Sequence, residues 1–394
     1  MATNAPWKDE RWLPGVLNFS QMGSLKDCGL IQNAIGKIDK DASAIDLHLS
    51  ADAYEMLRGS VKPFDRNYSD ILKDTYYAKR HEKEKDDTFH LKTGNCYVFK
   101  ILEKLHPAII NQSPFYGQAT AKSSIGRIDV IARLIVDGMK EYEKFIPEEI
   151  STGEMFLEIT PITFDVKVKS GESISQLRFC NGDFDNSLIT DVKFIKSILN
   201  INDNFKNLAT LSVDVSNFQI SKELSAAAYC ANNNSTNTPI ELWGEKNYNP
   251  KEFWLLTESQ EVRNIKSITI KKDKFYILRS IERISLPEGV CIYCRAMDET
   301  LGEMRIHYAG FVHPLFGLKR EDRIGTPLIF EVRGHNVDVL LTQGEILARL
   351  FFYRMSCNAE EPKEENQKKE KINASNISYG DQELKLSKFF KDWE

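Results

Sequence analysis

An internal repeat constrains the fold of this 394-residue chain more than any other feature of its sequence. Glu158 is followed 13 residues later by Gly171, and Glu331 is followed at the same interval by Gly344. In both places the glycine is followed by a glutamate, and a leucine comes six residues after the glycine. A glycine at a fixed distance from the same acidic residue predicts the same turn at the end of the same strand.

The repeat extends upstream of these two segments. Cys96-Tyr97-Val98, with Glu103, matches Phe275-Tyr276-Ile277, with Glu282, at a constant offset of 179 residues. Agreement between turn glycines, glutamates and apolar runs is evidence for a common origin of both copies. We therefore predict a tandem duplication that covers about 40–185 and 250–356.

The local texture of both copies is that of β-strands. Residues 164–169 alternate apolar and polar side chains without a slip, as a strand with one buried face does. Turn residues bound such runs, as in Lys169-Ser170-Gly171-Glu172 and Asn181-Gly182-Asp183. With 42% hydrophobic and 28% charged residues the chain has ordinary globular composition. From the alternation and the turn residues we expect a mainly β protein with few short helices.

Changes in composition divide the chain into four parts. We expect one domain over 1–185, a polar connecting segment over 186–249, a second domain over 250–356 and a charged tail over 357–394. The tail begins with five Glu and four Lys between residues 360 and 371, which suits a solvated segment. It ends with Leu386, Phe389, Phe390 and Trp393, whose spacing of i, i+3, i+4 and i+7 predicts an amphipathic C-terminal helix that docks on the protein.

Charge and hydropathy exclude several classes of partner. The formal net charge is −5 and the pI is near 5.9, so the global field opposes coating by a nucleic acid. The sequence contains no apolar run of 18 residues, and residues 1–11 lack the apolar core of a signal peptide. The seven cysteines are odd in number and scattered. We therefore expect a cytoplasmic protein with reduced thiols, no membrane and no nucleic acid among its partners.

A zinc-finger-like spacing stands out against this background. Cys291 and Cys294 form a Cys-x-x-Cys, and His307 and His313 follow at an interval that a finger would accept. Finger histidines lie on a helix, however, whereas residues 305–312 are apolar and aromatic like a strand. We expect no structural zinc.

The densest polar cluster of the first copy spans residues 121–130. Lys122, Ser123, Ser124 and Arg127 surround Gly126 and offer several hydrogen-bond donors to phosphate oxygens. Two serines before a strand also suit a turn or a cap. The cluster by itself therefore leaves a nucleotide-binding segment and a local turn as alternatives.

Several short motifs, in their order and spacing, resemble the long two-domain form of deoxycytidine triphosphate (dCTP) deaminase, a relative of the deoxyuridine triphosphatases. The resemblance covers about residues 12–356. The motifs are Leu13-Pro14-Gly15-Val16-Leu17, Ala44-Ile45-Asp46-Leu47, Lys122-Ser123-Ser124-Ile125-Gly126-Arg127-Ile128-Asp129-Val130, Arg133-Leu134-Ile135-Val136-Asp137, Ile146-Pro147, Glu158-Ile159-Thr160-Pro161, Ser175-Gln176-Leu177-Arg178-Phe179, Arg305-Ile306-His307-Tyr308-Ala309-Gly310-Phe311 and Glu331-Val332-Arg333.

The resemblance implies a deoxyuridine triphosphatase-like β-barrel or jelly-roll domain in each half. It further implies hydrolytic deamination of dCTP to dUTP and ammonia, and a homotrimer with active sites at subunit contacts. The catalytic residues it implies are Glu158, as general base and acid, with Ser123 and Arg127. The substrate-binding residues it implies are Lys122, Ser124 and Gln176.

The chemistry of deamination is compatible with these residue types. Water must attack C4 of cytosine, N3 must gain a proton and the amino group must leave as ammonia, so one carboxylate that accepts and returns protons can serve the cycle. Zinc-dependent deaminases instead use a His-x-Glu motif, which this sequence lacks. We expect a zinc-independent reaction, with Mg²⁺ bound to the substrate triphosphate as the one metal involved.

The sequence also departs from the superfamily pattern. Where deoxyuridine triphosphatases carry a water-activating aspartate, the first copy reads Phe145-Ile146-Pro147-Glu148, with only Glu148 as a substitute. The second copy has Met297-Asp298-Glu299-Thr300 in place of the serine pair and His313 in place of an acid, so we expect it to be degenerate. Alternatives to a deaminase of dCTP are a deoxyuridine triphosphatase or bifunctional enzyme, and a non-catalytic nucleotide-binding regulator. The candidate ligands are dCTP, dUTP and dTTP.

Overall fold

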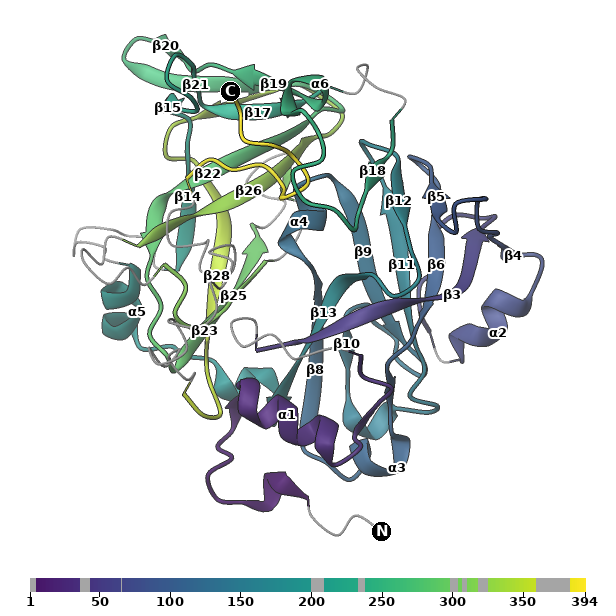
Figure 1. Cartoon of the computed structure of the whole chain (residues 1–394). Helices are drawn as coiled ribbons and strands as arrows, with labels where there is room; N and C mark the ends of the chain where they lie inside the picture. Colours follow the sequence, from purple (N-terminus) through teal and green to yellow (C-terminus); the bar gives the residue numbers. More distant parts are fainter. Residues whose placement is uncertain are drawn as a thin grey trace, which may run out of the picture. The chain divides into compact units, whose positions relative to one another are not determined.

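The computed structural model describes residues 5–35, 43–64, 66–199, 209–232, 238–297, 304–306, 310–317, 325–358 and 383–394. Strands dominate this part of the chain and helices are short, as Figure 1 shows. The longest helix among the described residues, α1, has nine residues. Within the described ranges no helix has the length and apolar character that crossing a membrane requires. The prediction of a mainly β protein is confirmed.

Two compact units make up the chain. Unit 1 contains Met1–Asn186, Asn232–Phe253 and Ser387–Asp392, and unit 2 contains Ser187–Ala231, Trp254–Leu386 and Trp393–Glu394. The strands of unit 1 are drawn mostly in purple to teal in Figure 1, and those of unit 2 in teal to yellow.

Unit 1 is built on a nine-stranded sheet with smaller sheets beside it. The strands of the large sheet follow the order β10-β8-β13-β3-β6-β11-β9, with β1 paired to β13 and β4 paired to β3. Their bounds are β1 Gly15–Val16, β3 Ile45–Met56, β4 Ala78–Arg80, β6 Tyr97–Ile101, β8 Phe115–Ala121, β9 Val130–Val136, β10 Lys144–Phe145, β11 Met155–Pro161 and β13 Ser173–Asn181. The small sheets hold β5 Phe89–Leu91, β12 Val166–Val168 and β18 Ile240–Glu241, and β2 Ile31–Gln32 with β7 Lys104–Leu105. The helices are η1 Pro6–Lys8, α1 Phe19–Asp27, α2 Tyr68–Lys73, α3 Pro107–Ile110, α4 Ser123–Gly126, η2 Pro147–Glu149 and α6 Pro250–Phe253.

Unit 2 is also built on a nine-stranded sheet. Its order is β19-β17-β22-β14-β28-β23-β25, with β26 paired to β22 and β24 paired to β26. The bounds are β14 Thr210–Asp214, β17 Ala228–Ala231, β19 Trp254–Thr257, β22 Phe275–Ile284, β23 Val290–Ala296, β24 Met304–Ile306, β25 Phe311–Val312, β26 Thr326–Gly334 and β28 Ile346–Arg354. The remaining elements are β15 Phe218–Gln219, β16 Ser225–Ala226, β20 Gln260–Val262, β21 Ile265–Ile270, β27 Val339–Thr342 and α5 Val192–Leu199. The helix η3, Phe184–Ser187, lies where the first range of unit 1 ends.

The same strand pairings occur in both units. In unit 1, β3 lies between β6 and β13, and β11 pairs with β6. In unit 2, β14 lies between β22 and β28, and β26 pairs with β22. The repeated sequence segments therefore fold into the same topology, and the predicted duplication is confirmed.

Individual hydrogen bonds repeat as well. The amide of Lys92 donates to Tyr97 Oη at 3.1 Å, and 179 residues on the amide of Lys271 donates to Tyr276 Oη at 3.2 Å. The turn glycines behave alike. Gly171 N donates to the carbonyl of Leu49 and Gly344 N to that of Val213, at 2.8 and 3.0 Å. Both glycines have positive φ values, of 90° and 85°, which side chains rarely adopt and which explain the shared Gly-Glu pair.

The second copy begins earlier than expected. Residues 186–249, predicted to be a connecting segment, contribute β14 and β17 to the large sheet of unit 2, where these strands do what β3 does in unit 1. The end of the predicted connecting segment belongs to unit 1. It is part of the range Asn232–Phe253, whose strand β18 pairs with β12. Because the segment as a whole is polar, the sequence analysis did not predict these strands.

Three of the four side chains of the C-terminal stripe are buried and Trp393 is half-buried, but the stripe does not form a helix. Leu386, Phe389 and Phe390 are at most 8% exposed, so the predicted docking is confirmed. The described residues 383–394 form no helix; the chain instead bonds to a neighbouring segment, where Lys391 N donates to the carbonyl of Tyr248 at 2.9 Å. The prediction of a helical tail is wrong, because so short a helix is marginal in water and edge-to-edge pairing satisfies the backbone here.

Candidate active site

Glu158 lies in the middle of β11, which is one strand in from the β9 end of the large sheet of unit 1. Its backbone is opposite Val98 of β6 on one side and Arg133 of β9 on the other. The residue is 0% exposed. A carboxylate in this position needs partners, since burying an unpaired charge is very costly.

Three side chains supply those partners. Arg133 Nη2 donates to Glu158 Oε1 at 2.6 Å, and the hydroxyls of Ser60 and Tyr142 donate to Oε2 at 2.7 and 3.0 Å. The guanidinium of Arg133 also stacks on the ring of Tyr142, 4.1 Å from its centroid. The side chain of Arg133 is 36% exposed, whereas that of Glu158 is 0% exposed, so the arginine is the partner nearer to solvent.

Titratable groups around Glu158 are held in their neutral forms. Burial, followed by the charge of Glu158, raises the pKa of Tyr142 to about 12. Burial and then the same charge raise the pKa of the Cys96 thiol to about 12. Both groups are therefore uncharged at neutral pH, and Tyr142 acts as a hydrogen-bond donor to the carboxylate.

The predicted substrate-binding residues lie around α4. Lys122 is the N-cap residue of this short helix, Ser123 and Ser124 form its first turn, and Arg127 is its C-cap residue. Lys122 Nζ donates to Asp46 Oδ2 at 2.7 Å, and Gln176 Nε2 donates to Asp46 Oδ1 at 3.1 Å. The structure thus brings Lys122 and Gln176 together through an aspartate that the sequence analysis did not single out.

Two further contacts fix this segment. Arg178 on β13 donates to Gln176 Oε1 at 3.1 Å and to Thr120 Oγ1 at 2.8 Å. Ser387 of the C-terminal segment donates from its hydroxyl to the carbonyl of Ser124 at 2.8 Å. Arg127 is only 7% exposed. Arg178 therefore holds the side chain of Gln176, and Ser387 holds the backbone of α4.

Glu158 and the α4 segment occupy different places within one protomer. The contacts of Glu158 come from Ser60, Arg133 and Tyr142, whereas those of Lys122 and Gln176 meet at Asp46. The register of β9 and β11 places Val130 opposite Pro161, three residues beyond Glu158, and α4 ends before Val130. Three strand residues span about 10 Å, so the backbone of Glu158 lies about that far along the sheet from Pro161, the residue opposite Val130.

The sequence analysis did not name Asp46, Arg133, Ser60 or Tyr142 as site residues, and only the first two had a sequence signal that could have identified them. Asp46 and Arg133 lie inside motifs that carry the family resemblance, and their strand positions could have marked them. Ser60 and Tyr142 come from irregular segments on either side of the strands, with no motif around them. Only tertiary structure places these two hydroxyls on the carboxylate.

The second copy keeps the glutamate but surrounds it differently. Glu331 lies on β26 opposite Ile277, as Glu158 lies opposite Val98, and is 8% exposed. Burial, and then the charge of Glu331, raises the pKa of the Cys294 thiol to about 12. Met297 follows β23, while Asp298, Glu299, Thr300 and His307 lie outside the described residues. His313 Nδ1 lies 2.8 Å from the carbonyl oxygen of Pro314.

Glu148 and the surface add little to the site. Glu148 is exposed on η2, where it was considered as a substitute for a water-activating aspartate.

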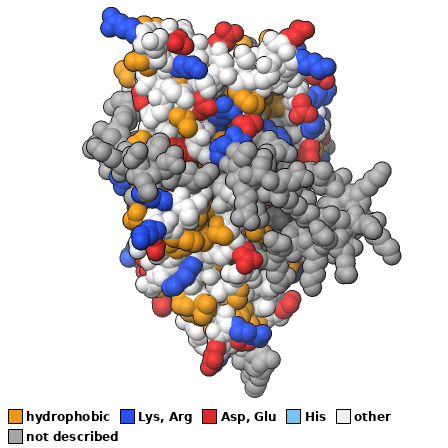
Figure 2. Space-filling model, turned by 90° about the vertical axis from the view of Figure 1, so that its left-hand side faces the viewer, with side chains coloured by type: hydrophobic (Ala, Val, Ile, Leu, Met, Phe, Trp, Pro, Cys, Tyr) orange, Lys and Arg blue, Asp and Glu red, His pale blue; other side chains and the backbone are white. Residues whose placement is uncertain are grey.

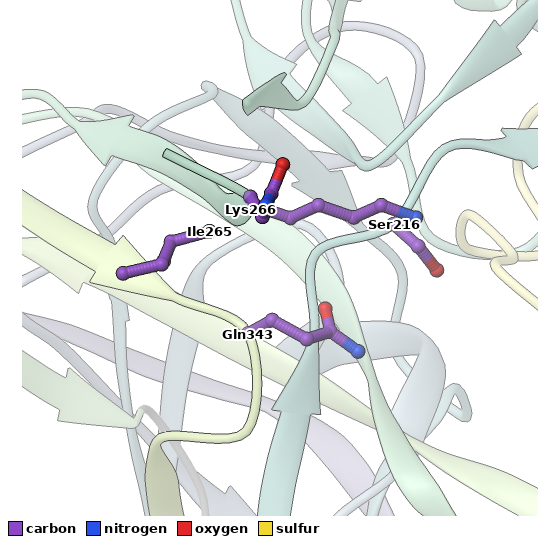
Figure 3. Close-up of a pocket in the computed structure, with 5 residues that line it drawn as sticks. Ser216, Ile265, Lys266 and Gln343 are labelled. Carbon is purple, nitrogen blue, oxygen red and sulfur yellow. The ribbon is translucent and has the colours of Figure 1, made fainter. Parts of the chain in front are cut away.

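On the face shown in Figure 2, acidic and basic side chains are interspersed among the described residues, without a field of one sign. A pocket of unit 2, shown in Figure 3, is lined by Ser216, Asn264, Ile265, Lys266 and Gln343, none of which belongs to the predicted site.

Glu143 predicts a pH-dependent stability. This residue follows Tyr142 in a strained conformation with a φ of 67°, and burial raises its pKa from 4.5 to about 7, against the opposing charge of Arg133. Between these values the folded chain binds more protons than the unfolded chain, so stability falls as the pH rises from about 4.5 to about 7. From pH 4.5 to about 7, at roughly 1.4 kcal/mol per pH unit, the full loss is about 3.5 kcal/mol.

Urea denaturation at pH 5 and pH 8 measures this loss. The Glu143→Gln variant should be more stable than the wild type at pH 8 and lose less stability between the two values. Glu149→Gln, which changes an exposed residue of η2, serves as the control. Identical pH dependence in wild type and Glu143→Gln would contradict the assignment.

Comparisons with known proteins match both halves of the chain. Residues 13–183 match the family model described as the N-terminal domain of 2′-deoxycytidine 5′-triphosphate deaminase, and residues 187–390 match the model of its C-terminal domain. Among solved structures, the crystal structure of 2′-deoxycytidine 5′-triphosphate deaminase from Agrobacterium tumefaciens is similar, with 25% sequence identity and a TM-score of 0.74. The similarity covers 87% of this chain and 99% of that one. The comparison with curated proteins gave no match.

Proposed function

The chain belongs to the 2′-deoxycytidine 5′-triphosphate deaminase family, and from this membership we infer that it is an enzyme that hydrolyses dCTP to dUTP and ammonia. Family models cover both units, and the similarity in structure extends over nearly the whole of the related enzyme. The observation that carries the chemistry is the buried carboxylate of Glu158 with its three donors.

We propose that Glu158 is the general base and acid. Its carboxylate takes a proton from water as the water oxygen bonds to C4 of cytosine, and it delivers that proton to N3. It then takes the proton of the new hydroxyl group and passes it to the amino group, whose bond to C4 breaks as ammonia leaves. One water is consumed and no net proton is gained or lost.

Arg133, Tyr142 and Ser60 would set the orientation of this carboxylate. Arg133 occupies one oxygen, and the two hydroxyls occupy the other. Because each hydroxyl can also accept a hydrogen bond, the site tolerates both the charged and the protonated carboxyl group. A base that must change its protonation state twice in one turnover benefits from such partners.

The α4 segment would bind the rest of the reacting system. We propose that Arg127 and Ser123 orient the water and stabilise charge on the tetrahedral intermediate, as donors fixed in advance do. Lys122, Ser124 and Gln176 would face the triphosphate. Lys122 and Gln176 are paired with Asp46 in the structure, so phosphate oxygens must compete with this aspartate for them.

We propose a homotrimer in which a second copy completes each active site. The supporting observation is that the hydrogen bonds of Glu158 come from Ser60, Arg133 and Tyr142, whereas Ser123–Arg127 form α4 and its C-cap, before β9 begins at Val130. In a symmetric assembly the same surface can present Glu158 to one neighbour and α4 to the other.

Mixing two inactive variants tests this arrangement. Glu158→Gln and Arg127→Ala should each be inactive alone. After dissociation and joint reassembly in equal amounts, sites that combine the intact glutamate of one variant with the intact arginine of the other make up about a quarter of the total. Activity of that order supports shared sites, and hybrids that form but remain inactive would refute them.

We propose that the only metal ion in the reaction is one that is bound to the substrate. Mg²⁺ would arrive on the triphosphate, which it binds through phosphate oxygens. Cys291 and Cys294 lie three residues apart on β23, so their side chains leave opposite faces of the strand and cannot bind one zinc ion as neighbours. Among the residues that the structure describes, no group of three or more His, Cys, Asp or Glu could hold a metal ion.

Ammonia release from dCTP is the test of the proposed activity, with dUTP, CTP and dCMP as comparison substrates. Ammonia without pyrophosphate identifies a deaminase, and pyrophosphate from dUTP identifies the diphosphatase alternative. Binding of dCTP with no ammonia would support a nucleotide-binding regulator instead. Cytoplasmic localisation, for which seven free cysteines are the support, remains a proposal.

A further inference from the structure

Two arginines of unit 2 share one carboxylate of the C-terminal segment. Arg279 Nη1 and Arg283 Nη2, both on β22, each lie 2.6 Å from an oxygen of Glu383. The three side chains are between 13% and 31% exposed, so the cluster is mostly shielded from solvent. Glu383 is the first residue of the described range 383–394.

The first copy has the same cluster, built from different residues. At the repeat offset of 179, Arg279 and Arg283 correspond to Lys100 and Lys104. These two lysines share the carboxylate of Glu154, each at 2.7 Å. Although burial opposes it, hydrogen bonds from both lysines lower the pKa of Glu154.

The second copy has lost the internal glutamate. At the offset of 173 that relates Glu158 to Glu331, the residue corresponding to Glu154 is Pro327. The strand register agrees with this assignment, because Pro327 lies directly opposite Arg283. Proline has no acceptor side chain, so β22 would present two shielded cations without the carboxylate that the first copy provides.

Neighbouring residues orient the side chain of Arg279 toward the C-terminal segment. Arg279 Nε and Nη2 donate to Asp214 Oδ2 at 3.1 and 2.7 Å. The other oxygen of Asp214 accepts from Gln343 Nε2 at 3.1 Å and from Ser216, two residues labelled in Figure 3. With two of its nitrogens held by Asp214, Arg279 presents Nη1 to Glu383.

We propose that Arg279 and Arg283 are the docking site of the C-terminal segment 383–394, and that Glu383 replaces the carboxylate lost at Pro327. The parts of the segment that belong to unit 2, up to Leu386 and from Trp393 on, are then a required part of that unit and not an appended tail. Its far end is held in the same unit, where the ring of Trp393 lies 5.6 Å from that of Tyr229. Trp393 therefore reports on docking.

The full-length chain labelled with 5-fluorotryptophan gives one fluorine resonance for each of its five tryptophans, and Trp393→Phe assigns the last. Glu383→Gln should move the Trp393 resonance toward its position in the urea-unfolded chain, and lower Tm by about 3 to 8 °C. Unchanged resonance and Tm would overturn the proposal.

Two control variants separate docking from general loss of charge. Asp392→Asn removes a carboxylate of the same segment that pairs with Lys246 at the surface, and should leave both readouts unchanged. Glu154→Gln breaks the corresponding cluster of the first copy, and should lower Tm without moving Trp393. If either control moves Trp393 as far as Glu383→Gln does, the arginine site is not what holds the segment.

Restoring the lost glutamate tests the correspondence itself. In the Glu383→Gln background, Pro327→Glu should regain at least half of the lost Tm, because it returns a carboxylate to Arg279 and Arg283. The Trp393 resonance should stay displaced, because the new carboxylate is not on the segment. No gain in Tm, or return of Trp393 to its original position, would overturn the replacement of Pro327 by Glu383.

Discussion

Glu158→Gln should reduce ammonia release from dCTP by about 10² to 10⁴-fold while leaving dCTP binding largely intact, because it removes the proton-transfer group and keeps its shape. The amide can still accept from Arg133, and the hydroxyls of Ser60 and Tyr142 can turn to accept from its NH₂ group. The loss should therefore appear in kcat, with the affinity for dCTP measured by calorimetry close to that of the wild type.

Glu331→Gln is the matched control in the second copy. It makes the same substitution at the corresponding position of the same sheet, opposite Ile277. If one copy does the chemistry, this variant should keep its turnover per folded protein and alter only Tm or assembly. A Glu331→Gln protein that folds, assembles and binds dCTP, yet is as inactive as Glu158→Gln, would show that the second copy contributes a catalytic group.

Arg133→Met should impair both stability and turnover. Glu158 is 0% exposed, and Arg133 is the cation paired with it. Removing one partner of a fully buried ion pair costs about 3–5 kcal/mol. The cost here should lie below that range, because the Arg133 side chain is 36% exposed and solvent screens the pair. Turnover should also fall, since Glu158 loses the donor that holds one of its carboxylate oxygens in place.

A double-mutant cycle distinguishes this cause from loss of packing. Adding Glu158→Gln to Arg133→Met leaves no buried charge, so the double variant should recover part of the stability that Arg133→Met lost, as Tm or urea denaturation will show. Tyr142→Phe, which removes a single hydroxyl from the same carboxylate, should have a smaller effect on both readouts. Additive losses in the cycle would mean that Arg133 acts through packing alone.

Much of the fold was predictable because it depends on local patterns. Turn glycines such as Gly171 and Gly344 require positive φ, and alternation such as that of residues 164–169 requires a half-buried strand. Repetition of these patterns at constant offsets was enough to predict two copies of one topology. The same reasoning failed for β14 and β17, two short strands inside a largely polar stretch of sequence, for which no counterpart in the first copy was recognised.

The candidate site was predictable only in part. Motif order identified Glu158, Lys122, Ser123, Ser124, Arg127 and Gln176 as a set, but the structure assigns them to two groups held by different neighbours. Ser60 reaches Glu158 from 98 residues away in the sequence and Tyr142 from 16 residues away, both from irregular segments. No periodicity connects such residues, so their contact is a result of how the loops pack on the sheet.

The sequence by itself determined the duplication, the β character and the chemical types of the reacting groups, because each depends on residues that are close together or repeated at a fixed interval. Tertiary structure alone decided which side chains pair with those groups. Glu158 was visible in the sequence, but the donors on its carboxylate were not. Glu383 likewise gained its partners from β22, about 100 residues earlier, where Pro327 stands in place of the glutamate of the first copy. Partners of buried charges are set by long-range packing, and any segment that brings a carboxylate within hydrogen-bond distance can satisfy them.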